Sequence, residues 1–238
     1  MIYTSPFPTI EIPITPLHEH LFEHANKWAD KPALIDGPTG RRMTYAELRD
    51  AIAAVAAGLK SRGFKKGDVF AIFSPNIPEY AVAFFAVSTA GGVNTTINPL
   101  YTAEEVKRQL TDSTATFLVT IPQFLSVALE AVQDTSVKEI FVFGETEGAT
   151  PFSALLSGQT KSDVAIDPCT DLVALPYSSG TTGLPKGVML THYNLVANIQ
   201  QTTTVEKITP DDTLIGILPF YHIYGMTVIM GAALRSGA

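Results

Sequence analysis

The chain of 238 residues carries 16 Lys and Arg against 23 Asp and Glu, a formal net charge of −7. This balance lacks the basic excess typical of nucleic-acid-binding proteins. With 46% hydrophobic and 16% charged residues, the composition excludes a disordered or fibrous chain and allows a buried core. The single cysteine, Cys169, excludes an internal disulfide and fits a reducing compartment. Its Asp-Pro-Cys-Thr context indicates a linker rather than a catalytic thiol.

The N-terminal segment predicts an extended stretch followed by a helix. Its first residues have no basic and apolar pattern of a signal peptide, so none is expected. Residues 4–15 are rich in Pro and β-branched residues, and Pro16 suits a first helical position. The apolar side of this helix would consist of Leu17, Leu21 and Trp28.

Three histidines fall in the same helix, His18, His20 and His24. Two of them are one turn apart, which raises the possibility of a metal site. The His-Glu-x-x-His pattern of zinc proteases fails, because Phe22 stands where the second histidine is needed. We therefore predict a solvent-exposed helix face, and we assign no metal ligand in the chain.

Alternating strands and helices follow. Residues 44–47 form a capping box, and the helix that it opens repeats apolar residues at helical spacing until Gly63: Leu48, Ile52, Val55 and Leu59. Further strands are expected at 69–73, 92–96, 117–119 and 140–143, with helices at 78–90, from Thr102, and at 124–132. This alternation predicts an α/β fold with parallel or mixed sheets flanked by helices on both faces. Residues 144–170 are polar and aperiodic, and we interpret them as a loop or subdomain junction.

A glycine- and hydroxyl-rich loop then follows a strand at 171–177. Its glycines allow several backbone N–H groups to point at one anion, its hydroxyls add neutral donors, and its lysine adds a positive charge. The candidate phosphate-binding residues are Ser178, Ser179, Gly180, Thr181, Thr182, Gly183 and Lys186. The loop differs from the common P-loop, because Pro185 precedes the lysine and Gly187 follows it. A generic turn between strands is the alternative.

Beyond the loop we expect a strand at 188–190 and a helix capped by Thr191 that runs through Asn198. Residues 213–234 contain no Asp, Glu, Lys or Arg and are long enough to span a bilayer. Pro219 and His222 interrupt this stretch near its middle, so we predict a buried strand, loop and helix rather than a membrane span.

Two blocks carry a family resemblance. Residues 177–187 resemble the signature loop of the adenylate-forming superfamily, which includes acyl-CoA synthetases, aryl-CoA ligases, luciferases and peptide-synthetase adenylation domains. Residues 218–226, Leu-Pro-Phe-Tyr-His-Ile-Tyr-Gly-Met, resemble the acid-binding segment of CoA ligases and luciferases. This block is particularly similar to that of plant 4-coumarate–CoA ligases. The resemblance extends over the whole chain, which would form part of a large N-terminal AMP-binding domain, residues 1–238.

The resemblance implies a two-step reaction. A carboxylic acid attacks the α-phosphorus of Mg²⁺–ATP to form an acyl-adenylate, and coenzyme A then displaces AMP. It implies that the loop holds the β- and γ-phosphates, that His222 orients the carboxylate as a catalytic residue, and that Tyr224 and Val228 line the acyl cavity. Without the resemblance, His222 would be interpreted as an ordinary core histidine, and the other two as core residues.

Several expectations depend on polypeptide that the resemblance places beyond residue 238. The adenine-, ribose- and magnesium-binding residues and the mobile C-terminal lid would all lie there, so the chain alone is expected to be inactive. Its partners would be a small carboxylic acid, ATP, CoA and the rest of its own polypeptide, in the cytoplasm, with a peroxisomal location left open. A fatty acyl-CoA synthetase, an ATP-binding module without turnover, a structural domain with a decayed site and a luciferase-like oxygenase are the alternatives.

Overall fold

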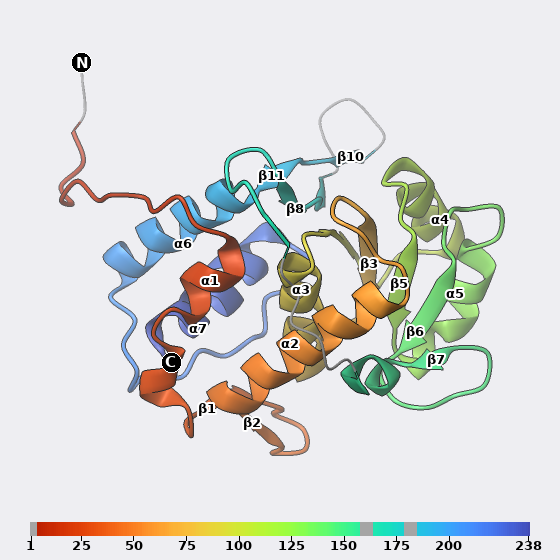
Figure 1. The fold of residues 1–238 in the computed structure, drawn as a ribbon, viewed down its shortest axis with the longest axis horizontal. Coiled ribbons are helices and arrows are strands. Elements are labelled where there is room, and N and C mark those ends of the chain that lie inside the picture. The colour runs from red at the N-terminus through yellow and green to blue at the C-terminus, as the bar shows by residue number, and fades with distance from the viewer. Residues whose placement is uncertain (1–3, 158–163, 179–184) are drawn as a thin grey trace.

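The computed structural model describes residues 4–157, 164–178 and 185–238. A seven-stranded sheet lies at its centre, in the order β11-β8-β4-β3-β5-β6-β7 (Figure 1). The middle of the sheet consists of four parallel strands: β3 (Val69–Phe73), β4 (Val93–Ile97), β5 (Phe117–Thr120) and β6 (Glu139–Val142). The outer strands are β7 (Thr150–Pro151), β8 (Leu172–Ala174) and β11 (Leu190–Thr191), of which only β11 is antiparallel to its neighbour.

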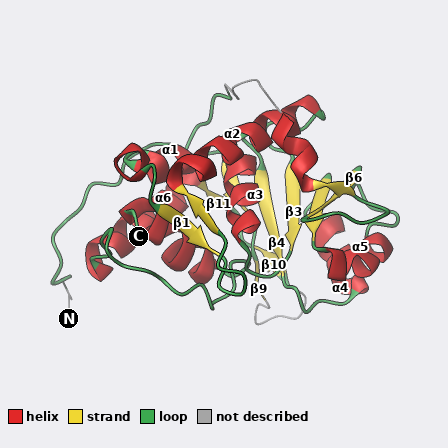
Figure 2. Ribbon diagram, turned by 90° about the horizontal axis from the view of Figure 1, so that it is seen from below, coloured by secondary structure: helices red, strands yellow, loops and turns green. Residues whose placement is uncertain are grey.

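Helices cover both faces of the sheet (Figure 2), which confirms the predicted α/β fold. Alternate residues of β3 point to opposite faces: Phe70 and Ile72 pack with α2 (Tyr45–Ser61) and α3 (Pro78–Thr89). Ala71 and Phe73 pack on the other side with α4 (Ala103–Asp112) and α5 (Leu125–Ala131), which a short 3-10 helix, Pro122–Phe124, precedes. Because both faces of β3 are covered, its sequence is a continuous apolar run.

A second group of helices forms one flank of the molecule (Figure 1). They are α1 (Leu17–Phe22), a 3-10 helix (Ala25–Trp28), α6 (His192–Glu206), a π-helix (Gly225–Gly231) and α7 (Ala232–Ser236). The α1 helix contacts α3, α6 and α7, so the first helix of the chain packs against the last. A two-stranded sheet that the sequence did not predict, β1 (Pro32–Ile35) with β2 (Arg42–Thr44), precedes α2.

Local sequence signals set the helix starts as expected. The predicted caps Thr44, Thr102 and Thr191 all close capping boxes, with Glu47, Glu105 and Asn194 as their reciprocal partners. The α6 helix is longer than predicted and continues to Glu206, where Lys207 ends it at a φ of 52°. None of the helices within the described ranges is long and apolar enough to span a bilayer.

The segment interpreted as a polar junction contains ordered structure. A 3-10 helix, Phe152–Ser157, packs on α2 and buries Phe152 and Leu155. Gly58 makes this contact possible, because a Cβ there would lie 2.1 Å from the Leu155 carbonyl oxygen. The approach of a backbone carbonyl to a helix leaves no local periodicity in the sequence, so this contact was not predicted.

The prediction of a solvent-exposed histidine face was wrong for His20, which is 3% exposed. The α1 helix is enclosed by α6 and α7, and Arg235 donates a hydrogen bond to the His20 carbonyl at 2.8 Å. Burial lowers the pKa of His20 and of His18 to about 4 each. These rings are therefore neutral near pH 7 and are part of the packing between helices.

Two strand predictions near the C-terminal end were also wrong. Residues 188–190 do not form one strand: Lys186–Gly187 forms β10, and β11 begins only at Leu190. Residues 213–217 form no strand, and Ile215 and Ile217 are 75% and 79% exposed. A strand needs a partner edge for its backbone, and here an asparagine side chain, Asn76, binds part of the backbone instead.

Candidate active site

The two ends of the predicted phosphate loop form a short hairpin. Strand β9 (Tyr177–Ser178) pairs in antiparallel fashion with β10, so that Ser178 lies opposite Lys186 and Tyr177 opposite Gly187. Both Ser178 and Lys186 are exposed. The other candidates from the loop, Ser179, Gly180, Thr181, Thr182 and Gly183, lie outside the described residues. The hairpin thus brings the Ser178 hydroxyl and the Lys186 ammonium group, from the two ends of the loop, to neighbouring positions at its base.

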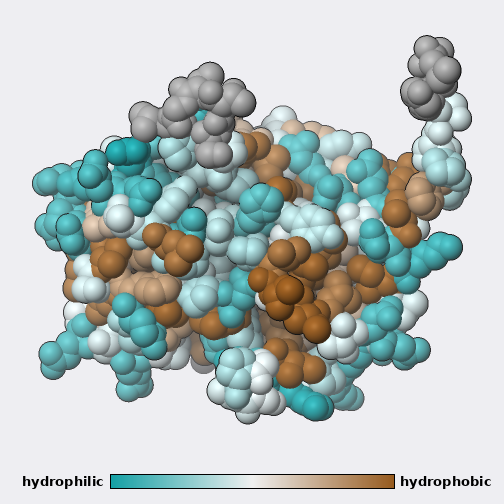
Figure 3. Space-filling view, turned by 180° about the vertical axis from the view of Figure 1, so that it is seen from behind, coloured by the Kyte–Doolittle hydropathy of each residue, from teal (hydrophilic) through white to brown (hydrophobic). Residues whose placement is uncertain are grey.

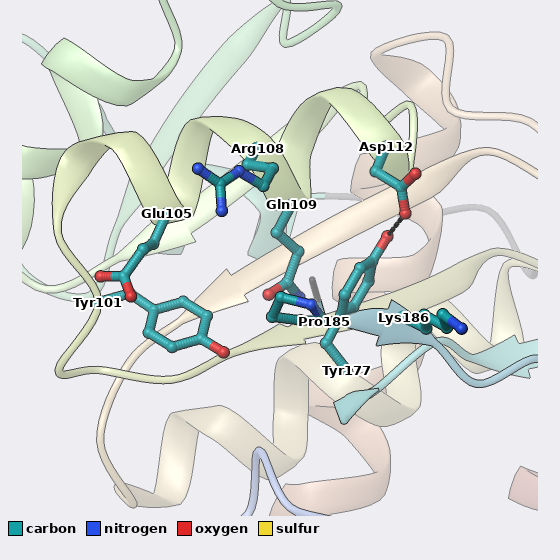
Figure 4. Close-up of a pocket in the computed structure, with 8 residues that line it drawn as sticks. All are labelled: Tyr101, Glu105, Arg108, Gln109, Asp112, Tyr177, Pro185 and Lys186. Atoms are coloured by element: carbon teal, nitrogen blue, oxygen red, sulfur yellow. Dashed lines mark hydrogen bonds between the residues drawn. The ribbon is translucent and has the colours of Figure 1, made fainter. Parts of the chain in front are cut away.

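A cavity of about 440 Å³ opens between this hairpin and helix α4 (Figure 4). Its walls consist of Tyr101, Glu105, Arg108, Gln109, Asp112, Tyr177, Pro185 and Lys186. The lining combines two phenol rings with side chains of both charges, which suits a ligand with an aromatic or apolar part and polar groups. The cavity thus adjoins the described end of the predicted phosphate loop.

A hydrogen bond fastens the base of the loop to α4. The Tyr177 hydroxyl donates to Asp112, the last residue of that helix (Figure 4). Burial, together with this carboxylate, raises the pKa of Tyr177, so the phenol stays protonated and remains a donor. The ring also packs on Gly187, where an added Cβ would lie 3.2 Å from Tyr177 Cε2 and 3.1 Å from the Leu175 side chain. The final glycine of the signature loop therefore has a packing reason in addition to any role in anion binding.

The same strand end holds the two predicted site segments. At the carboxyl end of β4, the Thr95 hydroxyl donates to the Leu175 carbonyl at 3.1 Å, and Leu175 lies two residues before β9. The Thr96 hydroxyl donates to the Tyr221 carbonyl at 2.8 Å, immediately before His222. Because consecutive residues of a strand point to opposite faces, the chain before the loop hairpin and the acid-binding segment reach the carboxyl end of β4 from opposite faces of the sheet.

Sequence reasoning missed these anchoring residues, although a signal was present. The β4 strand reads Val-Asn-Thr-Thr-Ile, and all five residues are buried, whereas the neighbouring β3 is wholly apolar. Asn94, Thr95 and Thr96 are at most 2% exposed. Buried polar groups require hydrogen-bond partners, so a polar run within a central strand indicates a place where the strand holds a loop.

The predicted catalytic residue His222 lies on the surface, just before the π-helix. Its Nδ1 accepts a hydrogen bond from the Tyr224 backbone N–H at 3.3 Å. In the neutral ring the proton is then on Nε2, so Nε2–H is the group that the ring can donate to an anionic ligand. Tyr224 is 49% exposed and Val228, four residues on, is partly buried.

Another close approach brings the acid-binding segment onto the start of the π-helix. A Cβ at Gly225 would lie 2.1 Å from the Pro219 carbonyl oxygen. The same carbonyl accepts the His222 backbone N–H at 3.1 Å. Only glycine allows this tight fold of the chain directly around His222.

The side chains that could ligate a metal are scattered over the molecule. Across residues 4–157, 164–178 and 185–238, no three His, Cys, Asp or Glu side chains lie together as a metal site would require.

The chain belongs to the family of AMP-binding enzymes, the adenylate-forming ligases, whose family model matches residues 21–238. It is 40% identical over its whole length to 4-coumarate–CoA ligase 2 of Solanum tuberosum and spans 45% of that protein. A long-chain-fatty-acid–CoA ligase from Archaeoglobus fulgidus superposes with a TM-score of 0.89 at 27% identity, over 99% of this chain and 48% of that one. ATP-bound MatB from Rhodopseudomonas palustris superposes with a TM-score of 0.79 at 30% identity, over 95% of this chain and 44% of that one.

These comparisons confirm the predicted resemblance at the level of family and fold. The chain spans about half the length of the relatives it matches. The roles assigned to individual residues stay predictions.

Proposed function

We propose that this chain supplies the phosphate-binding and carboxylate-binding parts of an acid–CoA ligase that activates an aryl carboxylic acid of the hydroxycinnamate type. The observation that carries the proposal is that the chain just before the loop hairpin and the residue just before His222 are both held at the carboxyl end of β4, by Thr95 and Thr96. In-line attack of a carboxylate on the α-phosphorus requires the acid and the polyphosphate to lie side by side, and positioning is the main catalytic task in such reactions.

Each predicted site residue has a role in this scheme. The hydroxyl- and glycine-rich loop from Ser178 to Lys186 holds the β- and γ-phosphates while pyrophosphate leaves, since hydroxyls and an ammonium group suit phosphate oxygens. His222, through Nε2–H, orients the carboxylate of the acid. Tyr224 and Val228 line the acyl cavity. Magnesium enters with ATP as the Mg²⁺–ATP substrate complex.

In the second half of the reaction the thiol of coenzyme A attacks the acyl carbonyl of the adenylate, and AMP leaves with the bonding electrons. We propose that residues 1–238 act as part of the N-terminal AMP-binding domain, with a subdomain junction near 144–170. The relatives are about twice as long as this chain, which spans 45% of the first of them. Their additional half is the expected source of the adenine-binding groups and of the lid, so we expect no ligase activity from residues 1–238 by themselves.

A fatty acyl-CoA synthetase is the second candidate. It is favoured by the superposition on the long-chain-fatty-acid–CoA ligase of Archaeoglobus fulgidus. The 40% identity to a 4-coumarate–CoA ligase favours the aryl substrate instead. A module that binds ATP without turnover is the third candidate.

The test is pyrophosphate release by the complete polypeptide encoded by the gene, measured with hydroxycinnamates, benzoates and fatty acids of medium and long chain. Release that depends on a hydroxycinnamate supports the proposal, and a preference for fatty acids supports the second candidate. ATP binding without pyrophosphate release in the presence of any of these acids supports the third candidate, the ATP-binding module. Replacing Lys186 by Ala should lower the rate of adenylate formation by roughly 10- to 100-fold, the loss expected for one hydrogen bond to a charged group, and an unchanged rate would refute the assignment of the loop.

A further inference from the structure

The segment that precedes His222 has little regular structure but many specific contacts. Residues 213–221 contain no helix or strand, and Ile215 and Ile217 are largely exposed. Apolar side chains also gather in the middle of the molecular face opposite to that in Figure 1 (Figure 3). A segment of this kind would vary its conformation unless other side chains held its backbone.

One side chain replaces the missing partner strand. The Asn76 amide nitrogen donates to the Gly216 carbonyl at 2.7 Å and to the Leu218 carbonyl at 2.8 Å. Its Oδ1 accepts the Phe220 backbone N–H at 2.8 Å. Both hydrogens of the amide and its oxygen are thus used on alternate residues of one stretch, the spacing with which a neighbouring strand would bind it.

Asn76 is itself well placed to act as a fixed point. It lies three residues after the end of β3 and two before Pro78, the first residue of α3. Four residues on, Tyr80 is fully buried and its ring packs edge-on against Phe220 at a centroid distance of 5.7 Å. The backbone and the side chain of Phe220 are therefore both held by the start of α3.

The second anchor is on the next strand. The Thr96 hydroxyl binds the Tyr221 carbonyl at 2.8 Å, one residue before His222. Between them, Asn76 and Thr96 hold the backbone at four positions from Gly216 to Tyr221. His222, the residue whose ring would orient the substrate carboxylate, follows directly after the last of these anchored positions.

We propose that Asn76 is a positioning residue for acid activation: together with Thr96 it fixes the 216–221 backbone and thereby aims His222 at the carboxylate. The inference rests on the proposed function, because it concerns the role of His222 in that reaction. In this proposal Asn76 acts only by fixing the 216–221 backbone. The loss of acid activation on removing the Asn76 side chain should therefore depend on the presence of the His222 ring.

The test is a double-mutant cycle in the complete polypeptide, with Asn76→Ala and His222→Ala made singly and together. We expect Asn76→Ala to lower kcat/KM for the acid by roughly 10- to 100-fold, the scale on which misplacement by about 1 Å acts, while KM for ATP stays unchanged. In the His222→Ala background the same change should cost less than about twofold. An equal loss in both backgrounds, or no loss, would overturn the proposal.

Two further variants keep the result interpretable. Thr96→Val keeps shape and strand propensity while it removes the hydroxyl, so it should show the same dependence on His222 even if Asn76→Ala folds poorly. Asn198→Ala on the exposed face of α6 is the matched control and should leave all constants unchanged.

Hydrogen–deuterium exchange separates this inference from the proposed function. Asn76→Ala should speed exchange in residues 214–222 about tenfold or more, because its three hydrogen bonds to the segment are lost. If the wild-type polypeptide activates no acid, the proposed function fails, and with it the aiming of His222, whereas faster exchange would still support the anchoring. Unchanged exchange in this stretch would overturn the anchoring itself, whatever the activity.

Discussion

Acidification should destabilise this protein well above the pH at which its carboxylates protonate, because two histidines are buried as neutral rings. His192 is 0% exposed and His20 is 3% exposed. The pKa of each is lowered to about 4, by burial in the first place and for His192 also by the nearby His18. The His192 Nδ1 also accepts the Leu17 backbone N–H at 3.1 Å, a bond that protonation of Nδ1 would break.

The direction of the effect follows from linkage. The unfolded chain, with ordinary histidine pKa values near 6.5, binds more protons than the folded chain between about pH 6.5 and pH 4. The contribution of these neutral histidines to the free energy of unfolding is therefore fully present above about pH 6.5 and is lost as the pH falls towards 4. Between about pH 7.5 and pH 5 each of these histidines should lower the free energy of unfolding by about 2 kcal/mol, and His18, whose pKa burial also lowers to about 4, should add a similar amount.

The carboxyls whose pKa a backbone N–H group lowers act below this pH window. A backbone N–H bond holds the pKa of each of four carboxyls below its ordinary range, so their contributions are lost only below about pH 4.5. They are Glu47, Glu105, Asp167 and Asp212, bound by the N–H groups of Thr44, Thr102, Cys169 and Thr209 in turn.

Urea unfolding at a series of pH values measures the effect. His192→Asn places an amide oxygen near the position of Nδ1, which keeps an acceptor for Leu17 and removes the titration. This variant should lose about 2 kcal/mol less than the wild type between pH 7.5 and 5. His24→Asn, at a ring that is 42% exposed, is the control. The reasoning is refuted if the wild type is equally stable at both pH values, or if His192→Asn keeps the whole pH dependence.

Two further predictions concern packing and capping. Gly58→Ala should destabilise the protein by about 1–3 kcal/mol, although alanine favours a helix by roughly 0.8–1.0 kcal/mol, because its Cβ would collide with the Leu155 carbonyl. Gly37→Ala, with nothing within 4 Å, is the control, and a stabilised Gly58→Ala protein in urea unfolding would contradict the close approach of α2 and the Phe152–Ser157 helix. Thr191→Ala should cost about 1 kcal/mol, since it removes the hydroxyl that caps α6 through the Asn194 N–H. Thr191→Ser should restore most of that loss in the same assay, and equal stability of the two variants would argue against the cap.

The sequence by itself determined the features that depend on neighbours along the chain. Capping boxes depend on residues three positions apart, so the starts of α2, α4 and α6 could be read directly. The apolar run of β3 predicted a buried strand within the residues where it lies. The glycine- and hydroxyl-rich loop was recognisable because its pattern lies in consecutive residues, and the family resemblance drawn from it is confirmed.

Only the tertiary structure decided the features that depend on distant partners. Whether His20 is solvated depends on α6 and α7, and whether residues 213–217 form a strand depends on which backbone lies beside them. Asn76 and Gly216 are 140 positions apart, and no local period links them. Hydrogen bonding and burial act through space, so the backbone from Gly216 to Tyr221 and the Leu175 carbonyl are held by side chains that follow β3 or lie in β4.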